Sequence, residues 1–103
     1  MARMPGMTFS GGQSGRILLL EGAWSAAYAD DVERAALLLE QSVFPEQIDI
    51  DLSKIEAFDT FGAFLVNRTI AAVQEKGTKV TVKGGSEEAT LLLEQVRFVP
   101  KLL

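Results

Sequence analysis

The side chains of this sequence that could do chemistry are carboxylates, lysines and hydroxyls, because its 103 residues include no histidine and no cysteine. Histidine is the commonest general base and transition-metal ligand, and cysteine supplies thiolate nucleophiles and zinc ligands. Active sites that use neither residue are uncommon. We therefore expect a non-enzyme with no catalytic residue, no metal site and no cofactor.

One stretch, IEAFDTFGAF at residues 55–64, sets an acid and a hydroxyl just ahead of a helix and surrounds them with phenylalanines. Asp59 has the side chain of a helix N-cap, and Thr60 falls in the first turn, near amides that have no partner within the helix. An acid followed by a hydroxyl residue is common at the start of a helix and serves there as a cap. The aromatic residues around it are what raise the question of a binding surface.

A helical projection separates the side chains that follow Asp59. The predicted core face is Ala63, Val66, Ile70 and Val73. Phe64 and Arg68 fall opposite to that face, and Phe61 lies on the flank of this outer group. Burying a phenylalanine is worth about 1.5–3 kcal/mol, and two aromatic side chains facing outward would leave that stabilisation unused in a monomer. The pattern favours a partner-binding surface.

Two other groups of residues have simpler explanations. Asp49 and Asp51 alternate with aliphatic residues and point to the open face of a sheet, beside lysines, where charge pairs are the expected use. Gly84 and Gly85 before Ser86 form a helix start that could hold an anion, but a turn and cap is the simpler interpretation.

The formal net charge is −4 and the basic residues are scattered, which argues against a nucleic-acid partner. No basic run suited to a membrane surface is present, and no apolar stretch approaches the roughly 20 residues of a membrane span. We expect no direct membrane insertion by this chain. The first residues have no long apolar segment of the secretory type, so a cytoplasmic location is the default.

The elements that must position these residues follow from periodicity and turn signals. Strands are expected at 7–10, 16–24, 48–52 and 78–83. Helices are expected from the N-cap Ser25 to Pro45, from Asp59 to Lys76 with Gly77 closing the helix, and from Ser86 onward. The predicted fold class is α/β: a small mixed sheet of 4–5 strands, with helices mainly on one face and a parallel βαβ unit. One domain should cover residues 1–103, with 1–15 flexible or a short first strand and 98–103 a tail or the start of a linker.

The stretch IDIDLSKIEAFDTFGAFLV resembles the signature of STAS domains, which are found in sulfate transporters and anti-sigma-factor antagonists. The matching positions are Asp51, Leu52 and Ser53 at the end of a strand, then Asp59, Thr60, Phe61 and Gly62 for the family's Asp-Ser/Thr-x-Gly. The predicted element order matches the family throughout. The resemblance implies a STAS fold over nearly the whole chain.

Two branches of the family imply different functions. In phospho-regulated anti-sigma-factor antagonists the residue before the glycine is the Ser or Thr that a partner kinase phosphorylates, whereas here that residue is Phe61. An anti-sigma-factor antagonist acting as a partner-switching regulator is therefore the alternative interpretation. Thr60 remains a candidate phosphorylation site, at a helix N-terminus that tolerates added negative charge.

The sequence Asp-Thr-x-Gly-Ala is more similar to the STAS domains of Mla-type lipid ABC transporters, either an MlaB-like subunit or the N-terminal domain of an MlaE-family permease. That resemblance implies a non-catalytic regulatory domain of a phospholipid transport system, at the cytoplasmic face of the bacterial inner membrane. Its partners would be the ABC ATPase subunit and the permease. The expected partner-binding residues are Asp59, Thr60, Phe61, Gly62, Phe64 and Arg68.

Overall fold

The computed structural model describes residues 3–10 and 16–96. In chain order the elements are β1 (Gly6–Ser10), β2 (Arg16–Trp24), the 3-10 turn η1 (Ala26–Tyr28), α1 (Ala29–Gln41), β3 (Gln47–Phe58), α2 (Thr60–Glu75), β4 (Lys79–Lys83) and α3 (Glu87–Gln95). The segment 98–103, expected to be a tail or linker, lies outside the described residues. None of the described helices is long and apolar enough to cross a membrane.

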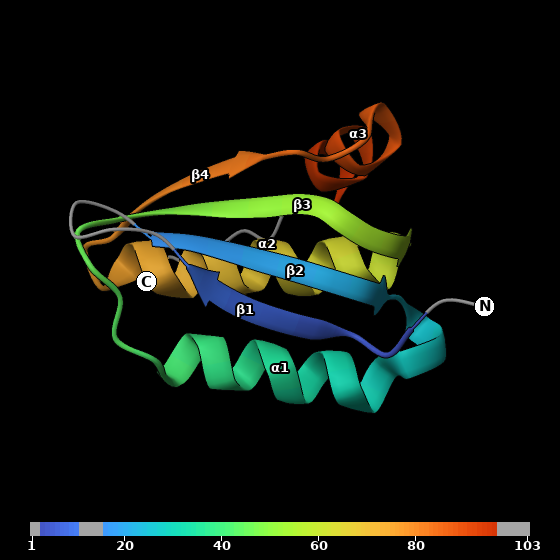
Figure 1. The fold of residues 1–103 in the computed structure, drawn as a ribbon, viewed down its shortest axis with the longest axis horizontal. Helices are drawn as coiled ribbons and strands as arrows, with labels where there is room; N and C mark the ends of the chain where they lie inside the picture. The colour runs from blue at the N-terminus through green and yellow to red at the C-terminus, as the bar shows by residue number, and fades with distance from the viewer. Residues whose placement is uncertain (1–2, 11–15, 97–103) are drawn as a thin grey trace, which may run out of the picture.

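The sheet has four strands in the order β1-β2-β3-β4 (Figure 1). β1 pairs antiparallel with β2, whereas β2 with β3 and β3 with β4 are parallel pairs. Each parallel pair is joined through a helix, α1 for the first and α2 for the second. The predicted mixed sheet with a parallel βαβ unit is therefore confirmed.

The core lies between one face of the sheet and the helices α1 and α2, which run side by side along it (Figure 1). The alternation of side chains in the strands places the core there, because every second side chain faces the helices. The alternating buried residues of the two central strands are Leu18, Leu20, Ile48, Ile50 and Leu52, and Ala23 and Trp24 at the end of β2 are buried as well. The opposite face carries charge pairs, as predicted: Lys83 Nζ lies 3.8 Å from Asp49 Oδ2.

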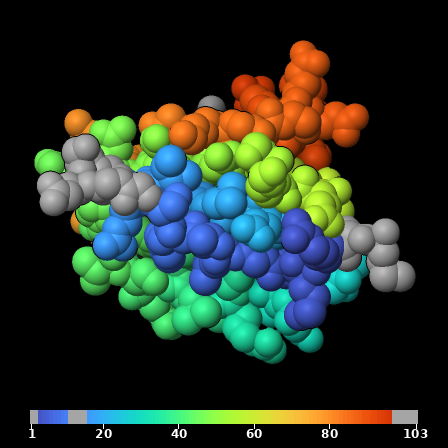
Figure 2. Space-filling view, viewed as in Figure 1, coloured from blue at the N-terminus to red at the C-terminus, as the bar shows by residue number. Residues whose placement is uncertain are grey.

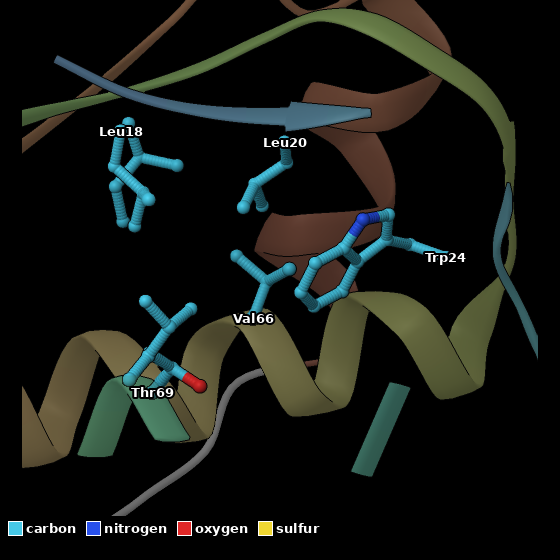
Figure 3. A pocket seen from close by; sticks show the side chains of 7 residues that line it. Leu18, Leu20, Trp24, Val66 and Thr69 are labelled. Atoms are coloured by element: carbon cyan, nitrogen blue, oxygen red, sulfur yellow. The ribbon is translucent and has the colours of Figure 1, made fainter. Parts of the chain in front are cut away.

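A small void of about 10 Å³ lies between β2, β3 and the two long helices. Leu18 and Leu20 reach down from β2 toward Val66 and Thr69 of α2, and the Trp24 ring closes one side (Figure 3). The Thr69 hydroxyl donates to Glu40 Oε2 at 3.3 Å, so the polar atom nearest the void has a partner. A void of this size has room for about one water molecule at most. It is packing space, too small for a ligand.

The predicted helix ends at Gly77 and Ser86 agree with the structure, whereas the one at Ser25 differs. The Ser86 hydroxyl accepts a hydrogen bond from the Ala89 amide at 3.1 Å, as an N-cap should. Gly77, which follows α2, has φ +95, the left-handed conformation that glycine adopts most readily. The expectation that Ser25 caps the first long helix is wrong, because a 3-10 turn intervenes and the Ser25 side chain makes no cap hydrogen bond.

β3 is longer than the sequence pattern indicated: it continues through the residues that we expected to form a short link and ends at Phe58. Its register against β2 slips twice, between Leu19 and Glu21 and again between Gly22 and Ala23. These irregularities break the strict alternation on which the prediction relied. β4 covers only the first part of this strand, pairing with Gln47–Asp51.

Candidate functional site

Asp59 organises the junction where β3 meets α2. Its Oδ1 accepts a hydrogen bond from the Gly62 amide at 2.9 Å, and its Oδ2 accepts one from the Ala26 amide, also at 2.9 Å. One carboxylate therefore caps α2 and also ties this cap to the connection between β2 and α1. The predicted N-cap is confirmed, and the bond to Ala26 is an addition that nothing in the local sequence indicated.

Replacing Asp59 by Ala should lower the free energy of unfolding by about 1–2 kcal/mol, because two amides lose their acceptor. Urea denaturation followed by circular dichroism measures the change. Ser86→Ala removes a cap that holds a single amide in the described structure, so its loss should be smaller. Equal losses for the two variants would show that the Ala26 bond contributes nothing.

Gly62 lies against the end of β2. A Cβ atom built at this position would be 1.8 Å from the Trp24 carbonyl oxygen and 3.2 Å from the Phe58 ring. Real Cβ atoms do not approach a backbone oxygen this closely, so the first turn of α2 can rest on β2 only with glycine here. This contact fixes the position of the neighbouring residues Thr60, Phe61 and Phe64 relative to the sheet.

The two phenylalanines have different environments. Phe64 is exposed, at 38% of its surface, as the helical projection predicted. Phe61 is half-buried and packs against the core cluster, so the expectation that both rings face outward is wrong for Phe61. Thr60 is exposed, so the outward surface of this turn is formed by Thr60 and Phe64.

Arg68 was expected on the outer face, but the structure directs it toward α1. Its Nη2 lies 2.7 Å from Glu33 Oε1 and its Nε lies 2.9 Å from Glu40 Oε2, with 23% of its side chain exposed. The hydrogen bond to Glu33, followed by that to Glu40, raises the pKa of the Arg68 guanidinium above its ordinary value. Arg68 therefore joins α1 to α2, two turns away from Thr60.

Replacing Arg68 by Met should destabilise the fold by about 1–3 kcal/mol, because Glu33 and Glu40 lose charged hydrogen bonds in a half-buried setting. The matched control is Arg34→Met, which removes an exposed arginine whose partner Asp31 lies 3.5 Å away, and which should cost less than about 1 kcal/mol. Thermal unfolding of both variants checks the difference. Similar losses would mean that the Arg68 pairs are only surface ion pairs.

Asn67, which the sequence analysis left unassigned, connects α2 to the end of α3. Its side-chain amide donates to the carbonyl oxygens of Leu93, at 2.8 Å, and Val96, at 2.7 Å. These carbonyls belong to the last turn of α3 and the residue that follows it, where backbone acceptors lack helical partners. Helical periodicity within α2 gives no signal of this contact, because the acceptors lie in a distant segment of the chain.

The remaining acids of the described residues do not gather into a metal site. Within the stretches 3–10 and 16–96, no three carboxylates gather closely enough to hold an ion. Asp51 Oδ1 instead accepts a hydrogen bond from the Ser53 amide at 2.9 Å. That bond, with a second from the Ser53 side chain and the charge of Lys83 nearby, lowers the pKa of the Asp51 carboxyl.

No protein-family model and no curated protein matches this sequence. Among solved structures, the crystal structure of an anti-sigma-factor antagonist, a STAS domain from Rhodobacter sphaeroides, superposes with a TM-score of 0.64. The match covers 92% of this chain and 97% of that chain, at 18% sequence identity. The chain therefore has a STAS-like fold, which agrees with the fold that the sequence resemblance implied.

Proposed function

We propose that this chain is a non-catalytic regulatory domain that binds a protein partner through the first turn of α2. The observation that carries the proposal is the exposed pair Thr60 and Phe64 on a turn held in place by the Asp59 hydrogen bonds and the Gly62 contact. A rigid turn presenting an aromatic ring loses little conformational entropy on binding. Partner surfaces commonly use such rings as anchors.

An anti-sigma-factor type of partner is favoured by the structural comparison, because the similar solved structure is described as an anti-sigma-factor antagonist. The usual phosphorylation position is Phe61, whose half-buried ring has no hydroxyl. Binding of such a partner would therefore proceed without the switch at that position. Thr60, which is exposed, would be the residue of this turn open to a kinase.

A second candidate partner is the ATPase subunit of a phospholipid ABC transporter, with its permease, at the cytoplasmic face of the bacterial inner membrane. The sequence Asp-Thr-x-Gly-Ala at residues 59–63 favours it, through its similarity to Mla-type STAS domains. The phenylalanine at position 61 is compatible with this role, which requires no phosphate. Both candidates would use the same surface of Thr60 and Phe64.

Replacing Phe64 by Glu should weaken binding of the true partner by at least tenfold, because a charge would replace the apolar ring at the contact. Calorimetric titration against a purified anti-sigma factor and a purified lipid-transporter ATPase from the same organism measures this and identifies which one binds. Thr60→Arg should have a similar effect through steric conflict.

The matched control is Leu38→Glu, which places the same charge on an exposed apolar residue of α1, 54% exposed. It should leave the affinity within about twofold. Unchanged binding by a folded Phe64→Glu protein would refute the assignment of this surface.

Mass spectrometry after incubation with the anti-sigma factor and ATP tests the switch separately, since a stoichiometric phosphate on Thr60 would restore a phospho-regulated mechanism.

A further inference from the structure

The second half of β3 has a strand neighbour on one side only. β2 pairs with β3 as far as Trp24 and Phe58, whereas the last pair between β3 and β4 is Asp51 with Lys83. Within the described part of the chain, the backbone of Ser53–Phe58 therefore has no strand beside it on the edge away from β2. An open edge of this kind is a template for another extended chain.

The chain leaves this edge because of Gly84. This residue has φ +76, a left-handed conformation, and a Cβ built on it would lie 2.3 Å from Asp51 Oδ1 and 3.1 Å from Ser53 Cβ. The backbone thus turns away close against β3, and α3 then stands out from the body of the protein beyond the strand (Figures 1 and 2). β4 cannot continue along β3 past this point.

A groove of about 150 Å³ remains between the open edge and α3. It is lined by Ile55, Glu56, Ala57 and Phe58 of β3 and by Ser86, Glu88, Ala89 and Leu92 at and after the start of α3. An extended segment can hydrogen-bond to the strand that forms one wall, whereas a helix has already paired its own backbone groups. The shape therefore selects a strand-like occupant.

The charges at this groove select a basic occupant. Glu88 is exposed, lines the groove and takes part in no ion pair among the described residues. Glu56, which also lines the groove, is already paired with Arg3 of this chain, with Nε 2.6 Å from Oε2, so Glu88 is the acid of the lining that remains available to a basic side chain. The strand that already lies on β3 shows the same complementarity, since β4 reads Lys-Val-Thr-Val-Lys beside Asp49 and Asp51.

We propose that an extended, lysine-containing segment of the protein partner adds to β3 at Ser53–Phe58, as a strand in line with β4. This inference rests on the proposed function in that it assigns a second contact to the same partner. Backbone hydrogen bonds to β3 provide the docking, and Glu88 favours a basic side chain at one end of the segment. A partner that uses both surfaces gains from the effective concentration created by the first contact.

The probe for this site is a synthetic peptide with the β4 sequence KVTVK, capped at both ends and titrated into the ¹⁵N-labelled full chain. The expected result is a set of amide shifts confined to Ser53–Phe58 and the first turn of α3. A KVPVK peptide, which lacks one backbone donor, and an EVTVE peptide of opposite charge should each bind at least fivefold more weakly. Equal binding of all three peptides, or shifts elsewhere on the protein, would overturn the proposal.

Variants of the chain provide a matched comparison. Glu88→Lys should weaken the KVTVK peptide at least fivefold, whereas Glu87→Lys, in the same turn but outside the groove lining, should change its affinity less than twofold. Equal effects of the two variants on peptide affinity would show that the peptide responds to the overall charge of α3 and not to Glu88 at the groove. Amides of Ser53–Phe58 that are already protected from hydrogen exchange in the free chain would mean that the edge is filled from within, which also overturns the proposal.

The two proposals fail independently. Phe64 lies outside the groove, so the Phe64→Glu variant should bind the peptide with unchanged affinity. If it also leaves partner binding unchanged while KVTVK still shifts Ser53–Phe58, the proposed surface on α2 is wrong and the strand-addition site stands. If Phe64→Glu abolishes partner binding and the KVTVK peptide shifts no amide signal, the surface on α2 stands and the strand-addition site is wrong.

Discussion

A Gly62→Ala chain should lose about 3 kcal/mol or more of its free energy of unfolding, or fail to fold at 37 °C, although it adds a single methyl group. The added Cβ would lie 1.8 Å from the Trp24 carbonyl oxygen and 2.7 Å from the carbonyl carbon. Both atoms are backbone, so no side chain can rotate away. Relief requires α2 to move off β2, which would pull the Gly62 amide from Asp59. Urea denaturation, or soluble yield where the variant does not fold, measures the effect.

The control for this prediction is Gly6→Ala, at a position where a Cβ would meet no atom within 4 Å. Its free energy of unfolding should stay within about 0.5 kcal/mol of the original chain. Ala63→Gly in the next position, with Gly62 unchanged, adds a second comparison, which should cost about 1–2 kcal/mol because a buried methyl group is lost together with helix propensity. A Gly62→Ala protein as stable as either control would show that the contact with Trp24 relaxes at little cost.

Replacing Trp24 by Ala should cost about 3–5 kcal/mol, the range for removing a fully buried large aromatic side chain. The ring has no exposed surface, and it already borders the 10 Å³ void, so the deletion enlarges an existing packing defect. Its Nε1 also donates to the Glu21 carbonyl at 3.1 Å, a bond that is lost with the ring. Thermal unfolding by calorimetry is the direct measurement.

Trp24→Phe separates the two contributions in this prediction. It keeps an aromatic ring in the core but removes the donor to Glu21, so its cost should be well below that of the alanine variant. If both variants lose the same stability, then the hydrogen bond, and not the buried volume, accounts for the role of Trp24. If neither variant is destabilised, the ring is not part of the stabilising core.

Much of the fold could be predicted because it follows from local patterns. Ile48, Ile50 and Leu52 alternate with acids, so β3 was placed correctly where the alternation holds. Beyond Ser53 that period fails, since the register slips against β2 depend on a neighbouring strand and not on β3 alone. The caps at Asp59 and Ser86 were predictable because a cap depends on residues within one turn.

The candidate site was less predictable because its geometry comes from contacts between distant segments. A projection of one helix cannot show that Glu33 and Glu40 of α1 attract Arg68, or that Phe61 packs against the core cluster. Gly62 was noted as part of a family signature, but its reason is the backbone of Trp24, which lies 38 positions earlier in the numbering. Phe64 was placed correctly because its exposure depends mainly on the face of its own helix.

The irregular second half of β3 also bears on self-association. An open strand edge can pair with the same edge of another copy and start aggregation. Here the register slips against β2 interrupt the regular pleat, and the edge carries the exposed charged residues Lys54 and Glu56. Bulges and edge charges are the means by which sheet proteins resist such pairing. A second copy carries the same charges on this edge, whereas the lysine-containing segment proposed above carries a charge opposite to that of Glu88. The edge should therefore favour that segment over self-association, and the protein should stay monomeric at concentrations where a flat apolar edge would not.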